Sequence, residues 1–326
     1  GTLKPMRIHL PNSARLVNLP GFLRGFDPTD PSRLEFSMHD RWVAVHPAVL
    51  VFAAAAADAV SHAGGMHEGR TMPVGSLPYL IRMGLFDYLK IDPGRHISSH
   101  EATGRFIPIQ RISNQADLTR FIVEMIPLLH ATPTQVEPIR YVVSELVRNV
   151  LEHSGSSRGA FVAAQCFRQS NVLGLGVCDA GVGIKASLSR HHGVATNSDA
   201  LYLSLRPGVT GTSARIGGTA YNAGAGLFFT KSIAVASRQY FALYSGDSLF
   251  KLKPTPKGKR LLLQADSRFD WHTLATGLPA WPGTLVGIDI ALDKGATFAA
   301  LMDLIRKAFG ESVRSKKSTL VRPRFT

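Results

Sequence analysis

The sequence predicts an α+β fold, in which a two-layer α/β sandwich follows a smaller α/β domain. Three observations support this. The chain has 326 residues, and at roughly 150 residues per domain that length suggests two domains. An amphipathic helix is expected over residues 144–154, and strand-like runs follow it. Hydrophobic residues make up 45% and charged residues 18% of the chain, a globular balance with ample material for a core.

Residues 1–95 form the predicted smaller α/β module. Two short runs have the alternation of half-buried strands, Arg7–Leu10 and Leu34–Met38. Pro47 stands where a helix would begin, and the alanine-rich run after it ends at Gly64 and Gly65. A second helical pattern covers 77–89. No phosphate loop, metal cluster or nucleophile motif occurs in this part. The order of strand, loop and long helix, with the segment 80–86, resembles the STAS-like domains of bacterial anti-sigma antagonist proteins.

Residues 96–116 read as a linker or an exposed hairpin, with a short strand candidate at 106–109. The main domain is expected over 117–310 and a basic tail over 311–326. Its predicted elements are, in order, a helix capped by Asp117, a helix with a Thr134–Glu137 capping box, a hairpin of 159–167 with 172–178, a long Gly/Ser/Thr-rich loop at 184–223, a helix at 227–237, strands at 240–244, 249–252, 260–265 and 284–291, and a helix at 298–309.

Charge and cysteine content narrow the function classes. The net charge of +14 favours an anionic partner such as a nucleotide, a nucleic acid or a membrane surface, although it also fits a soluble protein with a basic tail. Cys166 and Cys178 are too few to hold zinc alone, and the reducing cytosol is the expected compartment. The longest apolar run, Ala48 to Val60, is too short to span a membrane.

The helix over 144–154 carries Glu145, Asn149 and His153 on a strict four-residue step. Residues four apart share a helix face, so a carboxylate, an amide and an imidazole point the same way. A carboxylate can orient and deprotonate a water molecule, and an amide oxygen is a ligand that Mg²⁺ accepts beside phosphates. Taken alone, the pattern also fits an ordinary half-exposed helix.

Two glycine-containing segments and a late strand complete the pattern. Asp179 follows an apolar strand, and a buried carboxylate there needs a donor such as the adenine amine; Gly181 and Gly183 allow a sharp turn after it. Further on, Gly224, Ala225, Gly226 and Leu227 open a helix, where backbone amides and the helix dipole favour an anion such as a triphosphate. Thr284 opens the late strand, from which its hydroxyl could reach the same base as Asp179.

This ordered set resembles the GHKL ATPase superfamily, built on the Bergerat ATP-binding fold, over residues 117–292. The resemblance implies a Mg²⁺-ATP site. In it, Glu145 and Asn149 match the N-box, with Asn149 as the magnesium ligand and Glu145 as the catalytic base. Asp179, Gly181 and Gly183 match the adenine-binding box, and Gly224 and Gly226 match the next glycine box. Residues 184–223 would be the ATP lid. The spacing of Glu145, Asn149 and His153 is most similar to the anti-sigma-factor serine kinases.

Several alternatives stay open from the sequence. His153 either orients phosphates or is an ordinary helix-end histidine. Lys231, Arg206 and Arg215 are further candidates for phosphate contacts, weighed against solvated side chains. The protein either hydrolyses ATP or phosphorylates a protein serine or threonine, or it is a non-catalytic ATP-gated switch for a protein partner. A third reading is an ATPase that binds nucleic acid through its basic tail. The sequence does not indicate the oligomeric state.

Overall fold

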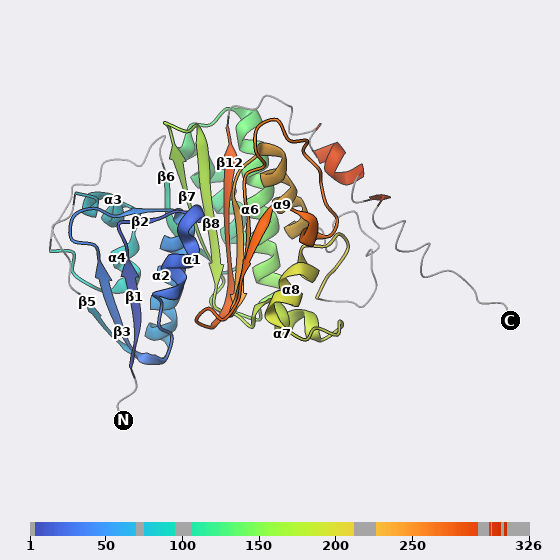
Figure 1. Ribbon diagram of the computed structural model, residues 1–326. Helices are drawn as coiled ribbons and strands as arrows, with labels where there is room; N and C mark the ends of the chain where they lie inside the picture. The colour runs from blue at the N-terminus through green and yellow to red at the C-terminus, as the bar shows by residue number, and fades with distance from the viewer. Residues whose placement is uncertain are drawn as a thin grey trace.

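A computed structural model of the chain describes residues 4–69, 75–94, 106–211 and 226–292, together with residues 300, 302–307, 310 and 311. The described part is a mixed α/β protein with a small parallel sheet at its N-terminal end and a seven-stranded antiparallel sheet flanked by helices (Figure 1). None of the helices in these ranges is long and apolar enough to cross a membrane.

The N-terminal module has the expected order of strands and helices. Its three-stranded sheet runs β1-β3-β5, with parallel neighbours, and β2 and β4 form a separate parallel pair. The expected single helix over 77–89 is divided, because Gly84 adopts the left-handed conformation at φ 73°. The elements are β1 (Pro5–Leu10), β2 (Ser13–Ala14), η1 (Leu16–Asn18), α1 (Leu19–Arg24), β3 (Asp30–Met38), β4 (Ala44–Val45), α2 (Pro47–His62), β5 (Met66–Gly69), α3 (Leu77–Arg82) and α4 (Leu85–Leu89).

The large sheet has the order β11-β10-β9-β12-β8-β7-β6, and all its neighbouring strands are antiparallel. Its elements and the helices between them are β6 (Phe106–Ile112), α5 (Gln115–Arg120), the π-helical turn η2 (Phe121–Met125), η3 (Ile126–Leu129), α6 (Pro133–His153), β7 (Ala160–Phe167), β8 (Val172–Asp179), α7 (Gly183–Ser189), α8 (Asn197–Ser204), α9 (Gly226–Ser237), β9 (Phe241–Gly246), β10 (Ser248–Leu252), η4 (Ser267–Phe269), β11 (His272–Ala275) and β12 (Trp281–Ala291).

Three sequence expectations about this part need correction, and a fourth is confirmed where the structure describes it. Part of the expected linker, residues 106–112, is the edge strand β6. The described part of the expected lid loop, 184–211, contains most of α7 and all of α8, and residues 212–223 lie outside the described residues. Residues 260–265 form no strand; β11 takes that place in the sheet. In the last expected helix, residues 302–307 are helical.

Both predicted helix caps shift along the chain. The side chain of Asn114 accepts from the Asp117 amide at 2.9 Å, so Asn114 is the N-cap and Asp117 lies inside the first turn. Helix α6 begins at Pro133, and the amide of Thr132 donates to Gln135 Oε1 at 2.8 Å. A proline is favoured at the first helical position, which places Thr134 within the helix instead of at its cap.

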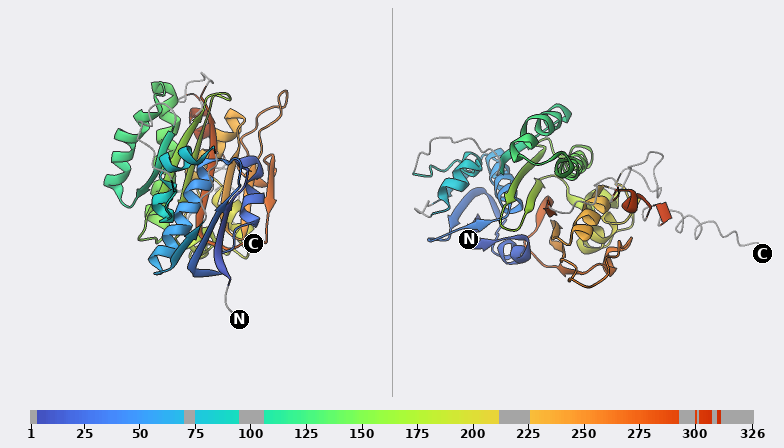
Figure 2. Two further views of the ribbon diagram at one scale, coloured as in Figure 1. Left: turned by 90° about the vertical axis from the view of Figure 1, so that its left-hand side faces the viewer. Right: turned by 90° about the horizontal axis from the view of Figure 1, so that it is seen from above.

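Helices cover both faces of the large sheet. Helices α6 and α9 pack on one face, and α2 packs on the other, between the large sheet and the small parallel sheet (Figures 1 and 2). The core on the α2 side joins the N-terminal module to side chains of the large sheet such as Phe161, Tyr244 and Leu285. The expected two-layer sandwich therefore carries a third layer, which the N-terminal module supplies. The domain boundaries themselves stay a prediction.

Glycines in the large sheet bring the start of α2 close to the strands. A Cβ atom on Gly176 would lie 2.4 Å from the backbone nitrogen of Ala48, and one on Gly287 would lie 2.6 Å from a methyl group of Leu16. His46 caps α2 beside Gly174: its Nδ1 accepts from the Ala48 amide at 3.0 Å. Its Nε2 therefore carries the proton and donates to Asp289 Oδ1, 3.1 Å away. The sheet is thus shaped to receive this helix.

Replacement of Gly176 by alanine should destabilise the protein. The added Cβ would meet backbone atoms of residues 47 and 48, which cannot rotate away, so we expect the free energy of unfolding to fall by about 1–3 kcal/mol. Urea denaturation followed by circular dichroism measures this. Gly21→Ala is the control, because a Cβ there meets nothing within 4 Å. Equal unfolding midpoints for the two variants would contradict the packing described here.

Candidate functional site

Helix α6 presents the predicted polar step toward the large sheet. Its apolar residues Leu146, Val147 and Val150 are buried in the core between α6 and the strands. Asn149 and His153 lie on the wall of a cavity at the end of this core, and the cavity has a volume of about 130 Å³. The four-residue spacing therefore brings both side chains to one place, as the sequence predicts.

Glu145 lies one turn earlier and is buried. Its Oε1 accepts from Arg148 Nη1 at 3.0 Å. Burial raises the pKa of the Glu145 carboxyl, and the Arg148 charge opposes that rise. Glu145 is absent from the residues that line the cavity. A carboxyl with a raised pKa is a better proton acceptor than an ordinary one.

Asp179 ends β8 and faces the cavity, with only 2% of its surface exposed. Burial raises its pKa to about 6, although the backbone amides of Gly181 and Thr284 donate to it. The Gly181 amide lies 2.7 Å from Oδ1. Thr284 is the register partner of Asp179 in the β12–β8 pair and also lines the cavity. The structure therefore brings together the two residues that the sequence assigned to one base.

The turn after Asp179 depends on its glycines. Gly183 has φ +77°, and a Cβ there would lie 2.5 Å from the Pro282 carbonyl oxygen. A Cβ on Gly181 would lie 2.3 Å from the Ser154 carbonyl oxygen. That same oxygen accepts from the Val182 amide at 2.8 Å. The turn is therefore pressed against the end of α6, and a larger side chain at either glycine would force it away.

Helix α9 begins beside the polar step of α6. Gly226 and Leu227 both line the cavity. A Cβ on Gly226 would lie 2.9 Å from Glu145 Oε2 and 3.2 Å from Asn149 Nδ2. The start of this helix, where backbone amides favour an anion, is thus next to the predicted metal ligand and the predicted base. Gly224 and Ala225 lie outside the described residues.

The remaining walls of the cavity are mostly apolar. They would suit a flat ring at the Asp179 end, where Val177 and Val286 lie, with polar groups farther out. Residues 204–211 add Ser204, Thr210 and Gly211 from the described part of the expected lid. The remaining lining residues are Leu146, Val150, Ser154, Gly183, Ile184, Ser187, Leu188 and Val209.

Two of the three additional phosphate candidates face other partners. Lys231 is fully buried, and its Nζ donates to Asp270 Oδ2 at 2.6 Å, to Ser267 Oγ and to the Gln264 carbonyl. Arg206 pairs with Asp266. The partners of Lys231 lie more than 30 residues later in the sequence. The position of Lys231 in its helix therefore could not predict them. Arg215 lies outside the described residues.

The sequence patterns missed two residues that hold the site together. Ser245 Oγ accepts from the Ile184 amide at 3.0 Å and donates to the Gly283 carbonyl at 2.7 Å. Trp281 Nε1 donates to the Asp179 carbonyl at 2.9 Å. Both act from strands that are distant in sequence. For Trp281 the sequence offers one signal, a tryptophan two residues before Gly283. A buried indole nitrogen needs a hydrogen-bond acceptor, although the sequence does not identify which one.

Comparisons with known proteins assign no family. A scan against protein-family models finds no match to the chain, and a search of curated proteins finds no relative.

The raised pKa of Asp179 should appear in the pH dependence of stability. Its folded pKa is about 6 against an ordinary value of 3.8. Between these pH values the folded state binds more protons than the unfolded state, so stability falls as pH rises. This rise of the pKa from 3.8 to about 6 corresponds to a destabilisation of about 3 kcal/mol. The destabilisation is absent below about pH 4 and complete above about pH 6 to 7.

Unfolding by urea at pH 4 to 8 measures this contribution. In Asp179→Asn the fall in stability between pH 4 and pH 7 that Asp179 causes should disappear. Without ligand, the variant should therefore be more stable than the parent at pH 7.5. If the parent and the variant show the same pH dependence, Asp179 is not a buried, ionised carboxylate at neutral pH.

Proposed function

We propose that this chain binds Mg²⁺-ATP in the cavity between α6, α9 and the large sheet, as a GHKL-type protein that hydrolyses ATP or transfers its phosphate to a protein serine or threonine. One observation carries the proposal. Four segments that are separate in sequence converge on one cavity, namely the polar step of α6, the 179–183 turn, the start of α9 and the start of β12. They are the four segments on which the resemblance rests.

The Asp179 end of the cavity suits adenine. A buried carboxylate with apolar neighbours needs a donor, and the exocyclic amine of adenine supplies one. Oδ1 already accepts from Gly181, so the second oxygen is the one assigned to the base. The Thr284 hydroxyl lies opposite in the strand register and would contact the same ring. A flat apolar base would then lie between Val177 and Val286.

The other end suits phosphates and a metal ion. Asn149 supplies an amide oxygen, and Gly226 places the start of α9 beside it. Within the described ranges no cluster of three histidine, cysteine or acidic side chains could hold a metal, and Mg²⁺ commonly takes few protein ligands beside substrate phosphates. Bound Mg²⁺ would neutralise charge on the phosphates. His153, on the same wall, is assigned to phosphate orientation, the feature shared with anti-sigma-factor serine kinases.

Glu145 is assigned as the proton acceptor. Its raised pKa suits the removal of a proton from water or from a protein hydroxyl at neutral pH. Arg148 holds one of its oxygens, which leaves the oxygen nearest Gly226 to accept the proton. The natural substrate class is then a protein segment with an exposed serine or threonine, and the STAS-like N-terminal module is the proposed site of a regulatory partner.

A second candidate function has a specific observation in its favour. Glu145 is held by Arg148 and lies outside the cavity lining, a placement that also suits a protein which binds ATP without turning it over. In that case ATP would act as a ligand that changes the lid and, through it, the binding of a protein partner. The two functions differ in the fate of the γ-phosphate.

Asp179→Asn should weaken ATP binding about 10- to 100-fold, because the amide places an N–H₂ group against the adenine amine in place of a charged acceptor. Isothermal titration calorimetry with ATP and Mg²⁺ at pH 7.5 measures the change. Asp303→Asn, at an exposed carboxylate, is the matched control. The variant is expected to be more stable without ligand, so a loss of binding cannot be ascribed to unfolding. ATP affinity equal to that of the parent would refute the adenine assignment.

Glu145→Gln should lower ATP turnover by about a hundredfold or more, with ATP affinity changed less than about threefold, because the amide cannot accept a proton. The measurement is ADP release with Mg²⁺, together with transfer of labelled phosphate to candidate protein substrates. Glu137→Gln, at an exposed position near the start of the same helix, is the control. Unchanged turnover in Glu145→Gln would remove the catalytic assignment, and the absence of turnover with every substrate would favour the switch.

A further inference from the structure

The segment of residues 253–271, between β10 and β11, is well anchored although it contains almost no regular structure. It stands out from the large sheet in the left view of Figure 2. The Lys253 amide donates to the Trp271 carbonyl at 2.8 Å and closes its base. Arg238, at the end of α9, donates to the carbonyls of Thr255, Pro256 and Lys259. One guanidinium therefore fixes the outer turn of the segment.

A buried ion pair anchors the returning half of the segment. Lys231 and Asp270 are both almost completely shielded from solvent, and Lys231 also donates to Gln264 and Ser267 of the segment. Breaking a buried pair by removal of one partner is strongly destabilising, because it leaves an uncompensated charge. This pair therefore holds the backbone of 264–270 in one position against α9.

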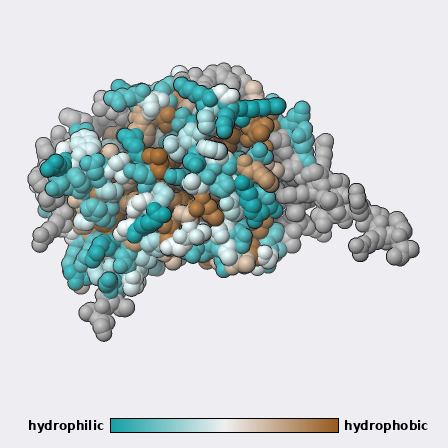
Figure 3. Space-filling view, in the orientation of Figure 1, coloured by the Kyte–Doolittle hydropathy of each residue, from teal (hydrophilic) through white to brown (hydrophobic). Residues whose placement is uncertain are grey.

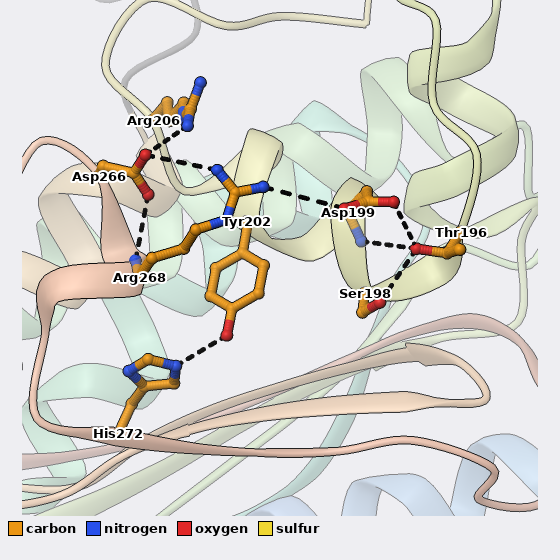
Figure 4. A network of polar contacts seen from close by, with 8 residues as sticks. All are labelled: Thr196, Ser198, Asp199, Tyr202, Arg206, Asp266, Arg268 and His272. Carbon is orange, nitrogen blue, oxygen red and sulfur yellow. Dashed lines mark hydrogen bonds and ion pairs between the residues drawn. The ribbon is translucent and has the colours of Figure 1, made fainter.

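Polar contacts also attach the segment to α8, in the expected lid (Figure 4). Arg268 pairs with Asp266 and approaches Asp199 at 3.8 Å. Just after the segment, His272 Nδ1 donates to the Asp270 carbonyl, so its Nε2 accepts from the Tyr202 hydroxyl at 2.8 Å. Both acidic side chains of the segment, Asp266 and Asp270, are thus paired with basic side chains of the protein itself.

The outer surface of the segment is aromatic and basic. Phe269 is 74% exposed, Leu262 53% and Trp271 50%. The amino groups of Lys253 and Lys259 lie 4.9 Å and 5.2 Å from the centre of the Trp271 ring. Lys257 and Arg260 are also exposed, and within the part of the chain that the structure describes no carboxylate pairs with these four basic residues. The face of the molecule that Figure 1 turns to the viewer is drawn as atoms in Figure 3, where hydrophilic residues separate small hydrophobic patches.

The composition of this surface favours one kind of partner. Protein–protein interfaces are depleted of lysine, and their centres are depleted of charge in general, whereas here lysines stand directly against the tryptophan. Proteins that bind single-stranded nucleic acid combine basic side chains along the phosphate backbone with aromatic rings on which bases stack. A rigid presentation of those rings lowers the ordering cost of binding.

We propose that residues 253–271 form a binding surface for single-stranded nucleic acid. Bases would stack on Phe269 and on Trp271, and Lys253 and Lys259 would turn from the Trp271 ring to contact phosphates together with Lys257 and Arg260. These residues are different ones from the basic residues of the C-terminal tail, 311–326. The proposal does not depend on the proposed ATP site, because the contacts that anchor the segment, from Lys231 and Arg238, are all made by protein groups. The segment's attachment to α8 places it next to the expected lid.

The test uses the full chain without ATP and a fluorescently labelled 20-nucleotide oligo-dT, with binding measured by anisotropy at several salt concentrations. Phe269→Ala and Trp271→Ala should each weaken binding about fivefold to a hundredfold, and Trp271→Phe should restore most of it because a ring remains. Lys257→Ala with Arg260→Ala should lower the slope of log affinity against log salt by about 1 to 2. Met66→Ala, at another exposed apolar side chain (64%), should change nothing.

Charge and stacking are separated with inorganic polyphosphate as a second probe. Its binding should weaken in the Lys257/Arg260 variant and stay unchanged in the two aromatic variants. The proposal is overturned if the aromatic variants bind oligo-dT as the parent does, if removal of residues 312–326 alone abolishes binding, or if a poly-glutamate peptide displaces oligo-dT at lower concentration than unlabelled oligo-dT does. The last result would point to an acidic protein partner.

Discussion

The structure depends on the burial of β8 on both faces. Helix α6 and its neighbours cover one face, and α2 from the N-terminal module covers the other. Gly174 and Gly176 let α2 approach the backbone of this strand, and every residue of β8 is buried. Such a strand must be apolar along its length, so a carboxylate at its end is energetically costly. Asp179 stands at that end, with a raised pKa that measures the cost.

The candidate site follows from this arrangement. The strand fixes Asp179 and its register partner Thr284, and α6 fixes Asn149 and His153 across the cavity from them. Gly226 then brings the start of α9 within contact of Glu145 and Asn149. On the far side of α9, Lys231 and Arg238 turn away from the cavity and anchor the 253–271 segment. One helix thus connects the proposed nucleotide site with the proposed nucleic-acid surface, and α8 joins them a second time.

The sequence predicts what depends on short spacing. The step Glu145–Asn149–His153, the turn at Gly181 and Gly183, and the helix start at Gly226 are local, and the structure places these segments in or beside one cavity. It does not predict what depends on distant partners. Ser245 and Trp281 support Asp179 from other strands, and Asp270 takes the charge of Lys231. Residues 260–265 resemble a strand. In the structure, however, Lys231 donates to the Gln264 carbonyl and Arg238 donates to the Lys259 carbonyl just before the range, so side chains of α9 and its end hold this stretch. The sequence also did not predict the third layer. Helix α2 is buried between the small sheet and the large sheet, and the strands of the large sheet are distant from it in sequence.

The most direct test of the central claim, that the cavity beside α6 is a nucleotide site, is a crystal structure of the protein with a non-hydrolysable ATP analogue and Mg²⁺. In that structure we expect the adenine amine to lie within hydrogen-bond distance of Asp179, with Thr284 against the ring. We expect the metal ion to be bound by the Asn149 side chain and the phosphates, and the start of α9 to face those phosphates. An analogue bound elsewhere, or an adenine placed away from Asp179, would show that the cavity is not the nucleotide site proposed here.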